Sequence, residues 1–192
     1  MKVRDVVVTA LFAALTAAGA QVSLLVPALG PVPFTLQNFV VILSGAILGP
    51  KLGALSQVVY LLIGAAGLPV FAGYSGGIGR IAGPTGGYLL SYPLAAFLIG
   101  ALAGKDRAPY WRTLVAMLAG EVIIFTLGVG QLWFYLSAKQ GAGVSLSVAL
   151  AKGLLPFILP DLVKVVAAAA VAQRLRRVLN FSDRSLERGA RA

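Results

Sequence analysis

Long apolar runs dominate this chain, and they limit its possible folds more than any other feature. A helix needs roughly 20 apolar residues to cross the hydrocarbon core of a bilayer. Hydrophobic residues make up 59% of the chain and charged residues 11%, whereas roughly a quarter of an average soluble domain is charged. We therefore expect an all-α integral membrane protein, built as a bundle of six transmembrane helices. The candidate spans are residues 5–26, 34–49, 52–68, 86–104, 111–137 and 148–173.

The spans are not equivalent. The second and third are short and meet at Gly49-Pro50-Lys51, which is a turn signal, so each is expected to be tilted or to cover only part of the bilayer. Pro93 is a possible kink in the fourth span. The first span is longer than the apolar core of a secretory signal peptide, and we interpret it as a retained helix.

Positive charge is distributed unevenly between the two sides of the predicted bundle. An even number of spans places both termini on one side, and cytoplasmic segments of membrane proteins are enriched in Lys and Arg. The loops on the opposite side carry only Arg80 and Lys139. We therefore predict cytoplasmic termini, with a membrane domain at residues 1–178 and a basic tail at residues 179–192. The cations assigned to the cytoplasmic side are Lys2, Arg4, Lys51, Lys105, Arg107, Arg112, Arg174, Arg176, Arg177, Arg184, Arg188 and Arg191.

Missing residue types exclude several functions. The chain contains neither cysteine nor histidine, which removes disulfides, thiolate and imidazole metal sites, and the commonest general base. No glycine-rich ATPase loop occurs, and Gly77–Gly83 has the wrong spacing for a dinucleotide fingerprint. The net charge of +10 reflects the cytoplasmic arginines and their attraction to anionic lipid, not nucleic-acid binding. We predict a protein that is not an enzyme, with no catalytic residue, metal or cofactor.

Two opposite charges, Asp161 and Lys164, interrupt the most apolar part of the last span. Residues three apart share one face of a helix, and an ionisable residue inside a membrane span is a functional-site hypothesis. The alternatives are polar recognition of a ligand and an ion pair that locks two helices. Pro156 and Pro160 are expected to prevent regular helix upstream and so to place Asp161 in a first turn, where unpaired N–H groups stabilise a carboxylate.

Four other polar or aromatic features each allow two interpretations. Arg80 is either a solvated loop residue or a cap on an anionic ligand. Glu121, nearer the cytoplasmic half of the fifth span, is either a packing residue (a buried protonated acid or a hydrogen-bond partner for another helix) or a ligand contact, and its depth favours packing. Gln37 and Asn38 either read the donors and acceptors of a ligand or cap the second helix. Trp133 belongs either to the aromatic belt of the membrane interface or to the wall of an apolar pocket.

Two apolar outer loops, one uncharged and one with Arg80 as its only charge, and a ridge of small residues complete the pattern. Residues 26–35 and 67–88 are rich in glycine, proline and apolar residues, a composition that suits backbone folded over a cavity or moving as a lid, rather than a flexible linker. Small residues at four-residue spacing in the first span permit close helix–helix approach, either within the bundle or against another protein. They are Ala10, Ala14 and Ala18.

Taken together, these stretches resemble the BioY family, the biotin-specific substrate-capture (S) components of energy-coupling-factor transporters. The resemblance covers the chain up to the arginine-rich tail. In the first span, Ala10–Leu15 also looks like the alanine motif with which S components dock on the transmembrane coupling protein. The four matching blocks, in order, are PVPFTLQ at 31–37, GLPVFAG at 67–73, GPTGGYL at 83–89 and PDLVK at 160–164.

The resemblance implies a multi-pass protein of a prokaryotic cell membrane, with a biotin pocket near the outer face and roofed by the outer loops. It also implies that the first helix meets the coupling (T) protein through its alanines, and that separate ATP-binding-cassette subunits hydrolyse ATP. Asp161 and Lys164 would be central ligands, with Arg80 a contributor. The predicted substrate-binding residues are Asp161, Lys164, Arg80, Gln37, Tyr88 and Trp133.

Biotin matches the chemistry of this charged pair. Its ureido ring has two N–H donors and one carbonyl oxygen, and its valerate chain ends in a carboxylate. Asp161 would accept from a ureido N–H, and Lys164 would donate to the ureido oxygen or to the carboxylate. Three alternatives remain: an S component for another vitamin, a solitary biotin facilitator, and an integral-membrane enzyme, which the missing histidine and cysteine disfavour.

Overall fold

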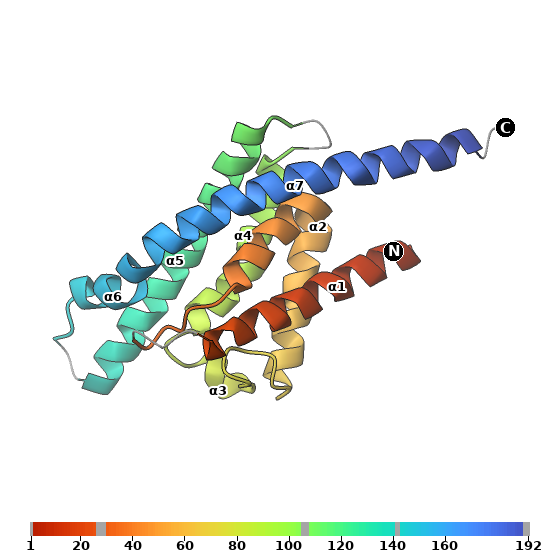
Figure 1. Cartoon of the computed structure of the whole chain (residues 1–192). Coiled ribbons are helices and arrows are strands. Elements are labelled where there is room, and N and C mark those ends of the chain that lie inside the picture. Colours follow the sequence, from red (N-terminus) through yellow and green to blue (C-terminus); the bar gives the residue numbers. More distant parts are fainter. Residues whose placement is uncertain (1, 26–29, 105–107, 141–142, 190–192) are drawn as a thin grey trace.

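The chain folds into a bundle of helices around a narrow apolar core (Figure 1). The computed structural model describes residues 2–25, 30–104, 108–140 and 143–189. Within these ranges no β-strand occurs, and an isolated bridge joins Phe71 to Ser75. The helices are α1 (Val3–Ala20), η1 (Gln21–Leu24), α2 (Gln37–Ala65), α3 (Ile78–Ile81), α4 (Gly86–Leu102), α5 (Tyr110–Gln140), α6 (Leu146–Gly153) and α7 (Leu155–Gly189).

Helix α2 is a hairpin of two helical halves. The backbone at Gly49 has φ 78° and ψ −178°, a conformation open to glycine but not to side chains with a Cβ. Gln57 Nε2 donates to Ser44 Oγ at 3.2 Å, and Gln37 Nε2 donates to Tyr60 OH at 2.6 Å. Because a straight helix would separate the second pair by about 35 Å, the two halves run antiparallel, side by side.

Among the described residues, four helices are long and apolar enough to cross a bilayer, judged by length and composition, and α4 is a shorter apolar helix. The hairpin divides α2 into rods of about 18 and 24 Å, each shorter than the ~30 Å hydrocarbon core, in line with the short second and third segments expected from the sequence. The four helices are Val3–Leu24, Gln37–Ala65, Tyr110–Lys139 and Leu155–Arg176.

Glycine permits the close contact between the hairpin and α4. A Cβ at Gly45 would collide with the carbonyl oxygen of Ala96. Replacing Gly45 with alanine is therefore expected to cost about 1–3 kcal/mol of stability through overpacking and to lower the melting temperature of the purified protein. Gly130→Ala is the matched control, because no atom lies within 4 Å of a Cβ there and alanine favours the helix. Equal melting temperatures for the two variants would contradict this account of the packing.

The last predicted span differs from expectation at its start. A short helix, α6, ends at Gly153, and the backbone breaks at Leu154 before α7 begins. Pro160 lies inside α7 and does not end it, because a proline near a helix start removes few hydrogen bonds. The prediction that Asp161 lies in a first turn is therefore wrong: it occupies the second turn of α7.

The two ends of the bundle differ in character. At one end, the α2 turn at Gly49 and Pro50 packs against Gly100 of α4, and Arg176 donates to the carbonyl of Ala46. The start of α1 and the end of α7 lie on the same side of the view in Figure 1. Lys105 and Arg107, as well as the side chains of the tail beyond Arg176, lie outside the described part of the chain. The opposite end holds residues 66–85 and the pocket.

Candidate functional site

A pocket lies at the end of the bundle opposite the Gly49 turn. Its cavity volume is about 40 Å³, with polar side chains on one wall and apolar ones on the others. Segments distant in sequence form its walls: the approach to α2, the loop after α2, the start of α4, the middle of α5 and the start of α7. The lining residues are Val32, Pro33, Thr35, Gln37, Asn38, Phe71, Ala72, Arg80, Thr85, Tyr88, Leu89, Tyr92, Phe125, Phe157, Asp161 and Lys164.

The charged pair of α7 forms one wall of this pocket. Lys164 Nζ lies 2.6 Å from Asp161 Oδ1, and Asp161 is only 3% exposed. Lys164 also donates to the Thr35 carbonyl at 2.7 Å and lies over the Phe34 ring, 5.1 Å from its centroid. Both charges are thus paired with each other and face a hollow, so the cost of burying them is partly offset.

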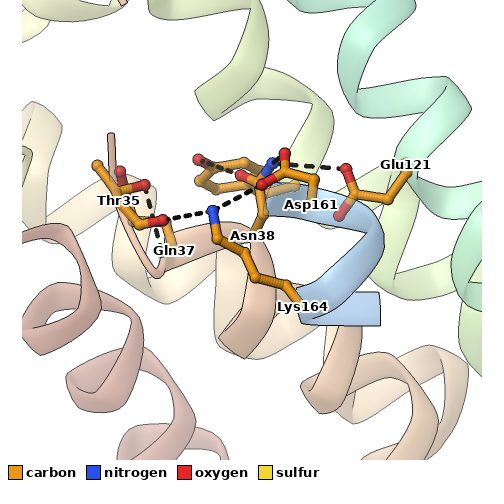
Figure 2. A network of polar contacts seen from close by, with 7 residues as sticks. Thr35, Gln37, Asn38, Glu121, Asp161 and Lys164 are labelled. Atoms are coloured by element: carbon orange, nitrogen blue, oxygen red, sulfur yellow. Dashed lines mark hydrogen bonds and ion pairs between the residues drawn. The ribbon is translucent and has the colours of Figure 1, made fainter. Parts of the chain in front are cut away.

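An amide from α2 joins the charged pair to a second acid (Figure 2). Asn38 Nδ2 donates to Asp161 Oδ2 at 3.1 Å and, at 3.5 Å, to Glu121 Oε2 on α5. Tyr92 OH of α4 donates to Asn38 Oδ1 at 3.2 Å. Four helices therefore meet in one polar network, in which Asn38 is the central member.

Gln37 fastens the roof of the pocket and does not cap α2. Its amide donates to Tyr60 OH, which donates to the Val70 carbonyl at 3.2 Å. At the start of α2 it is the Thr35 hydroxyl that accepts from the Gln37 backbone N–H, at 3.3 Å. Phe71 packs edge-on against Tyr60, with ring centroids 5.5 Å apart, and fills the space left by Gly64. Gln37 thus lines the pocket and also holds the segment that covers it.

The glycine-rich segment after α2 is ordered and fastened from two sides. Gln21, just after α1, donates to the Phe71 carbonyl at 3.2 Å and accepts from the Tyr74 N–H at 3.0 Å. Gln131 of α5 donates to the carbonyls of Ile81 and Gly83 at 2.7 and 2.9 Å. The segment therefore folds over the pocket as a roof, which excludes the linker interpretation.

Arg80 lies in the short helix α3 of this roof and is half-buried. Its guanidinium donates to the Ala72 carbonyl at 3.4 Å, and the residue lines the pocket. It is the only cation besides Lys164 in the described lining, so it lies where a ligand anion would meet it. This position favours the cap interpretation over that of a solvated loop residue, and the role of Arg80 toward a ligand stays a prediction.

Aromatic side chains form the remaining walls. Tyr88 is buried, donates its hydroxyl to the Gly153 carbonyl at 2.8 Å, and packs edge-on against Phe125 with centroids 6.3 Å apart. Phe34 and Phe157 stack with centroids 5.2 Å apart. The hydroxyl of Tyr88 joins α4 to α6, while its ring contributes to the pocket.

Trp133 is not brought to the pocket. Its indole N–H donates to the Val144 carbonyl at 2.9 Å, and the side chain is 43% exposed. It fastens the chain between α5 and α6, as an interface residue would. Five of the six predicted substrate-binding residues therefore share one pocket, and Trp133 lies outside it.

Several lining residues carried no functional prediction. Tyr92, Phe125 and Phe157 look in the sequence like ordinary apolar-helix residues, and no spacing signal marks them. The depth of Glu121 in its span favoured packing over ligand contact, and this residue does not line the pocket but accepts a hydrogen bond from Asn38, a residue that does. Glu121 lies about 16 Å along α5 from the start of the helix at Tyr110. The hydrogen bond from Asn38 reaches this depth.

The predicted alanine ridge faces away from the bundle. Ala10, Ala14 and Ala18 are exposed, whereas Phe12 and Thr16 point into the core. The three small residues therefore form a stripe on the outer face of α1, which is not used for packing within the described chain.

Comparison with known proteins agrees over most of the sequence. The family model described as the BioY family matches residues 1–181. The chain is similar to the "Probable biotin transporter BioY" of Pyrococcus horikoshii, with 46% identity over 92% of this chain and 98% of that one. It is also similar to the "Biotin transporter BioY" of Thermotoga maritima, with 44% identity over 91% and 97% of the two chains.

A solved structure has the same fold. It is described as the crystal structure of "the S-component for biotin from an ECF-type ABC transporter", with a TM-score of 0.76, 27% identity, and coverage of 91% of this chain and 92% of that one. The family model and the curated relatives both span nearly the full length, and the pocket is built from the blocks that resembled the family. The chain belongs to the BioY family.

Proposed function

We propose that this chain is the biotin-capture subunit of a vitamin uptake transporter and has no enzymatic activity of its own. One structural observation carries the proposal: a roofed pocket in a membrane bundle contains a buried Asp161–Lys164 pair 2.6 Å apart. Such a pair supplies an acceptor and a donor side by side. The identity of the ligand comes from the names of the relatives, which are described as biotin transporters or as a biotin S-component.

The ureido ring of biotin fits the polar wall of the pocket. An N–H of the ring donates to Asp161, and Lys164 donates to the ureido oxygen or the carboxylate. The thioether ring and valerate chain contact the aromatic walls, including Tyr88 and Phe157. Because ligands that lack the N–H groups would leave Asp161 with an unfilled acceptor site, this arrangement discriminates strongly against them.

Six transmembrane segments with cytoplasmic termini complete the proposed topology. The count follows when the two halves of α2 and the shorter α4 are included, with α6 and α7 together forming the last segment. The described cations Lys51, Arg112 and Arg174 belong to the end that would face the cytoplasm of a prokaryotic cell. Residues 1–178 form the single membrane domain, and the basic tail, 179–192, adds attraction to anionic lipid.

The outward-facing alanine stripe is the proposed contact with the transmembrane coupling protein. Small residues let helices approach closely, and the stripe on α1 is free of contacts within the described bundle. ATP-binding-cassette subunits, joined through that protein, supply the energy. The chain itself binds and reorients in the bilayer.

Titration of the purified protein with biotin and a panel of other vitamins tests the ligand. Biotin is expected to bind most tightly, and a thiamine or riboflavin affinity above that of biotin would overturn the assignment. Uptake of labelled biotin in cells lacking every coupling subunit tests the alternative of a solitary facilitator. Uptake that persists there at the full rate would remove the need for partners.

Arg80 provides a separate test of carboxylate recognition. Arg80→Gln is expected to weaken biotin binding about tenfold, because a hydrogen bond to a charged group contributes about 1.5–3 kcal/mol. The same variant should bind biotin amide, which lacks the carboxylate, about as well as the unaltered protein does. An equal loss of affinity for biotin and for biotin amide would mean that Arg80 acts by stabilising the roof and not by binding the carboxylate.

A further inference from the structure

The amide of Asn38 is held in one orientation from both sides. Its oxygen accepts from Tyr92 OH at 3.2 Å, and its nitrogen faces two carboxylates, Asp161 at 3.1 Å and Glu121 at 3.5 Å. A flipped amide would turn its oxygen toward the Asp161 carboxylate, which is paired with Lys164 and has no hydrogen to share. Asp161 therefore favours the orientation in which the amide nitrogen donates to it, and this orientation also places the nitrogen next to Glu121 Oε2.

Glu121 contributes to this network from outside the pocket. It is 6% exposed and is not among the residues that line the pocket, whereas Asn38 and Asp161 both are. Its Oε2 accepts from Asn38, and its Oε1 has no hydrogen-bond partner among the described residues. An acid buried in a membrane bundle is expensive, and the one described hydrogen bond of this carboxylate is to Asn38.

We infer that Glu121 and Tyr92 are positioning residues, which fix the Asn38 amide and through it the Asp161 carboxylate that recognises N–H donors of the ligand. This inference rests on the proposed biotin function and extends it to specificity. When a ligand N–H donates to Asp161, the Asn38 amide can still donate to Glu121. The Asn38 amide therefore keeps its orientation while Asp161 binds the ligand. Selectivity for N–H donors thus depends on a residue that lies outside the lining of this pocket, in an adjoining hollow that shares Asp161 and Phe125 with it.

The test compares biotin with an analogue methylated on both ureido nitrogens. Glu121→Leu is expected to weaken biotin binding about fivefold or more and to lower the ratio of the two affinities. Glu121→Gln keeps a carbonyl acceptor for Asn38 and should stay within about twofold of the unaltered protein. Ile124→Ala, an equally buried change on the same helix, should lower the melting temperature but leave the affinity ratio unchanged.

A double-mutant cycle separates positioning from general stability. In an Asn38→Leu background, Glu121→Leu should have no further effect on the ratio, because residues in one network are not additive. Additive losses, or an unchanged ratio in folded Glu121→Leu protein, would overturn the inference. If Glu121→Leu does not fold, Tyr92→Phe decides: because Tyr92 also lines the pocket, it must lower the ratio in the unaltered protein and have no further effect in the Asn38→Leu background. Failure of the unaltered protein to bind biotin would refute the proposed function instead.

Discussion

Replacing Asp161 with asparagine is expected to weaken biotin binding at least tenfold. The two carboxylate oxygens accept from different donors, Oδ1 from Lys164 and Oδ2 from Asn38. Either orientation of an asparagine amide would turn its own NH₂ group toward one of these donors. The variant therefore loses a charge-assisted hydrogen bond of about 1.5–3 kcal/mol, and 1.4 kcal/mol corresponds to a factor of ten in affinity. Calorimetric titration of the purified variant measures the loss.

Two controls separate this effect from unfolding. Asp5→Asn makes the same chemical change near the start of α1, where the carboxylate accepts from the Lys2 backbone N–H at 2.9 Å, and should leave biotin affinity unaltered. The double variant Asp161→Asn, Lys164→Gln removes the unpaired buried cation, so it should recover thermal stability without recovering binding. Unchanged affinity in the single variant would exclude the charged wall as the ligand site.

Sequence alone was sufficient where the signal is local. Apolar runs predicted an all-helical membrane protein, and Gly49-Pro50 predicted the turn that divides α2. The spacing of Asp161 and Lys164 predicted that they share a helix face, and their ion pair agrees. Each of these features depends on residues within about one helical turn of each other, so a residue pattern is enough to indicate it.

Contacts between helices that are far apart in sequence could not be predicted, because they depend on how far each helix is shifted along the bundle axis relative to the other. Asn38 and Glu121 are 83 positions apart, and their contact requires α2 and α5 to pack at one particular depth. Counting residues from the charged end of α5 favoured packing for Glu121, but it could not identify Asn38 as the partner. Trp133 is of a residue type that often lines apolar pockets, but its side chain does not face this pocket. Packing between helices decides which side of α5 turns inward, and residue type alone does not show that side.

Bulky substitution of the α1 alanine stripe is expected to stop transport while leaving binding intact. Leucine at Ala10, Ala14 and Ala18 preserves helix propensity and apolar character but fills the groove that close helix–helix approach needs. Because these side chains are exposed and far in sequence from the pocket walls, biotin affinity of the purified triple variant should match that of the unaltered protein. Biotin uptake in cells with all coupling subunits should fall by at least about tenfold.

The matched control uses alanines with the same exposure on a different helix. Ala167 and Ala170 lie on the exposed face of α7, so leucine at each of these two positions adds the same volume per residue to an exposed surface. Uptake should be retained in this control if α1 alone docks, and co-purification with the coupling protein should be lost only for the α1 variant. Full uptake by both variants would mean that the stripe faces lipid and does not dock. An equal loss of uptake in both variants would mean that added helix volume slows reorientation in the bilayer, rather than docking.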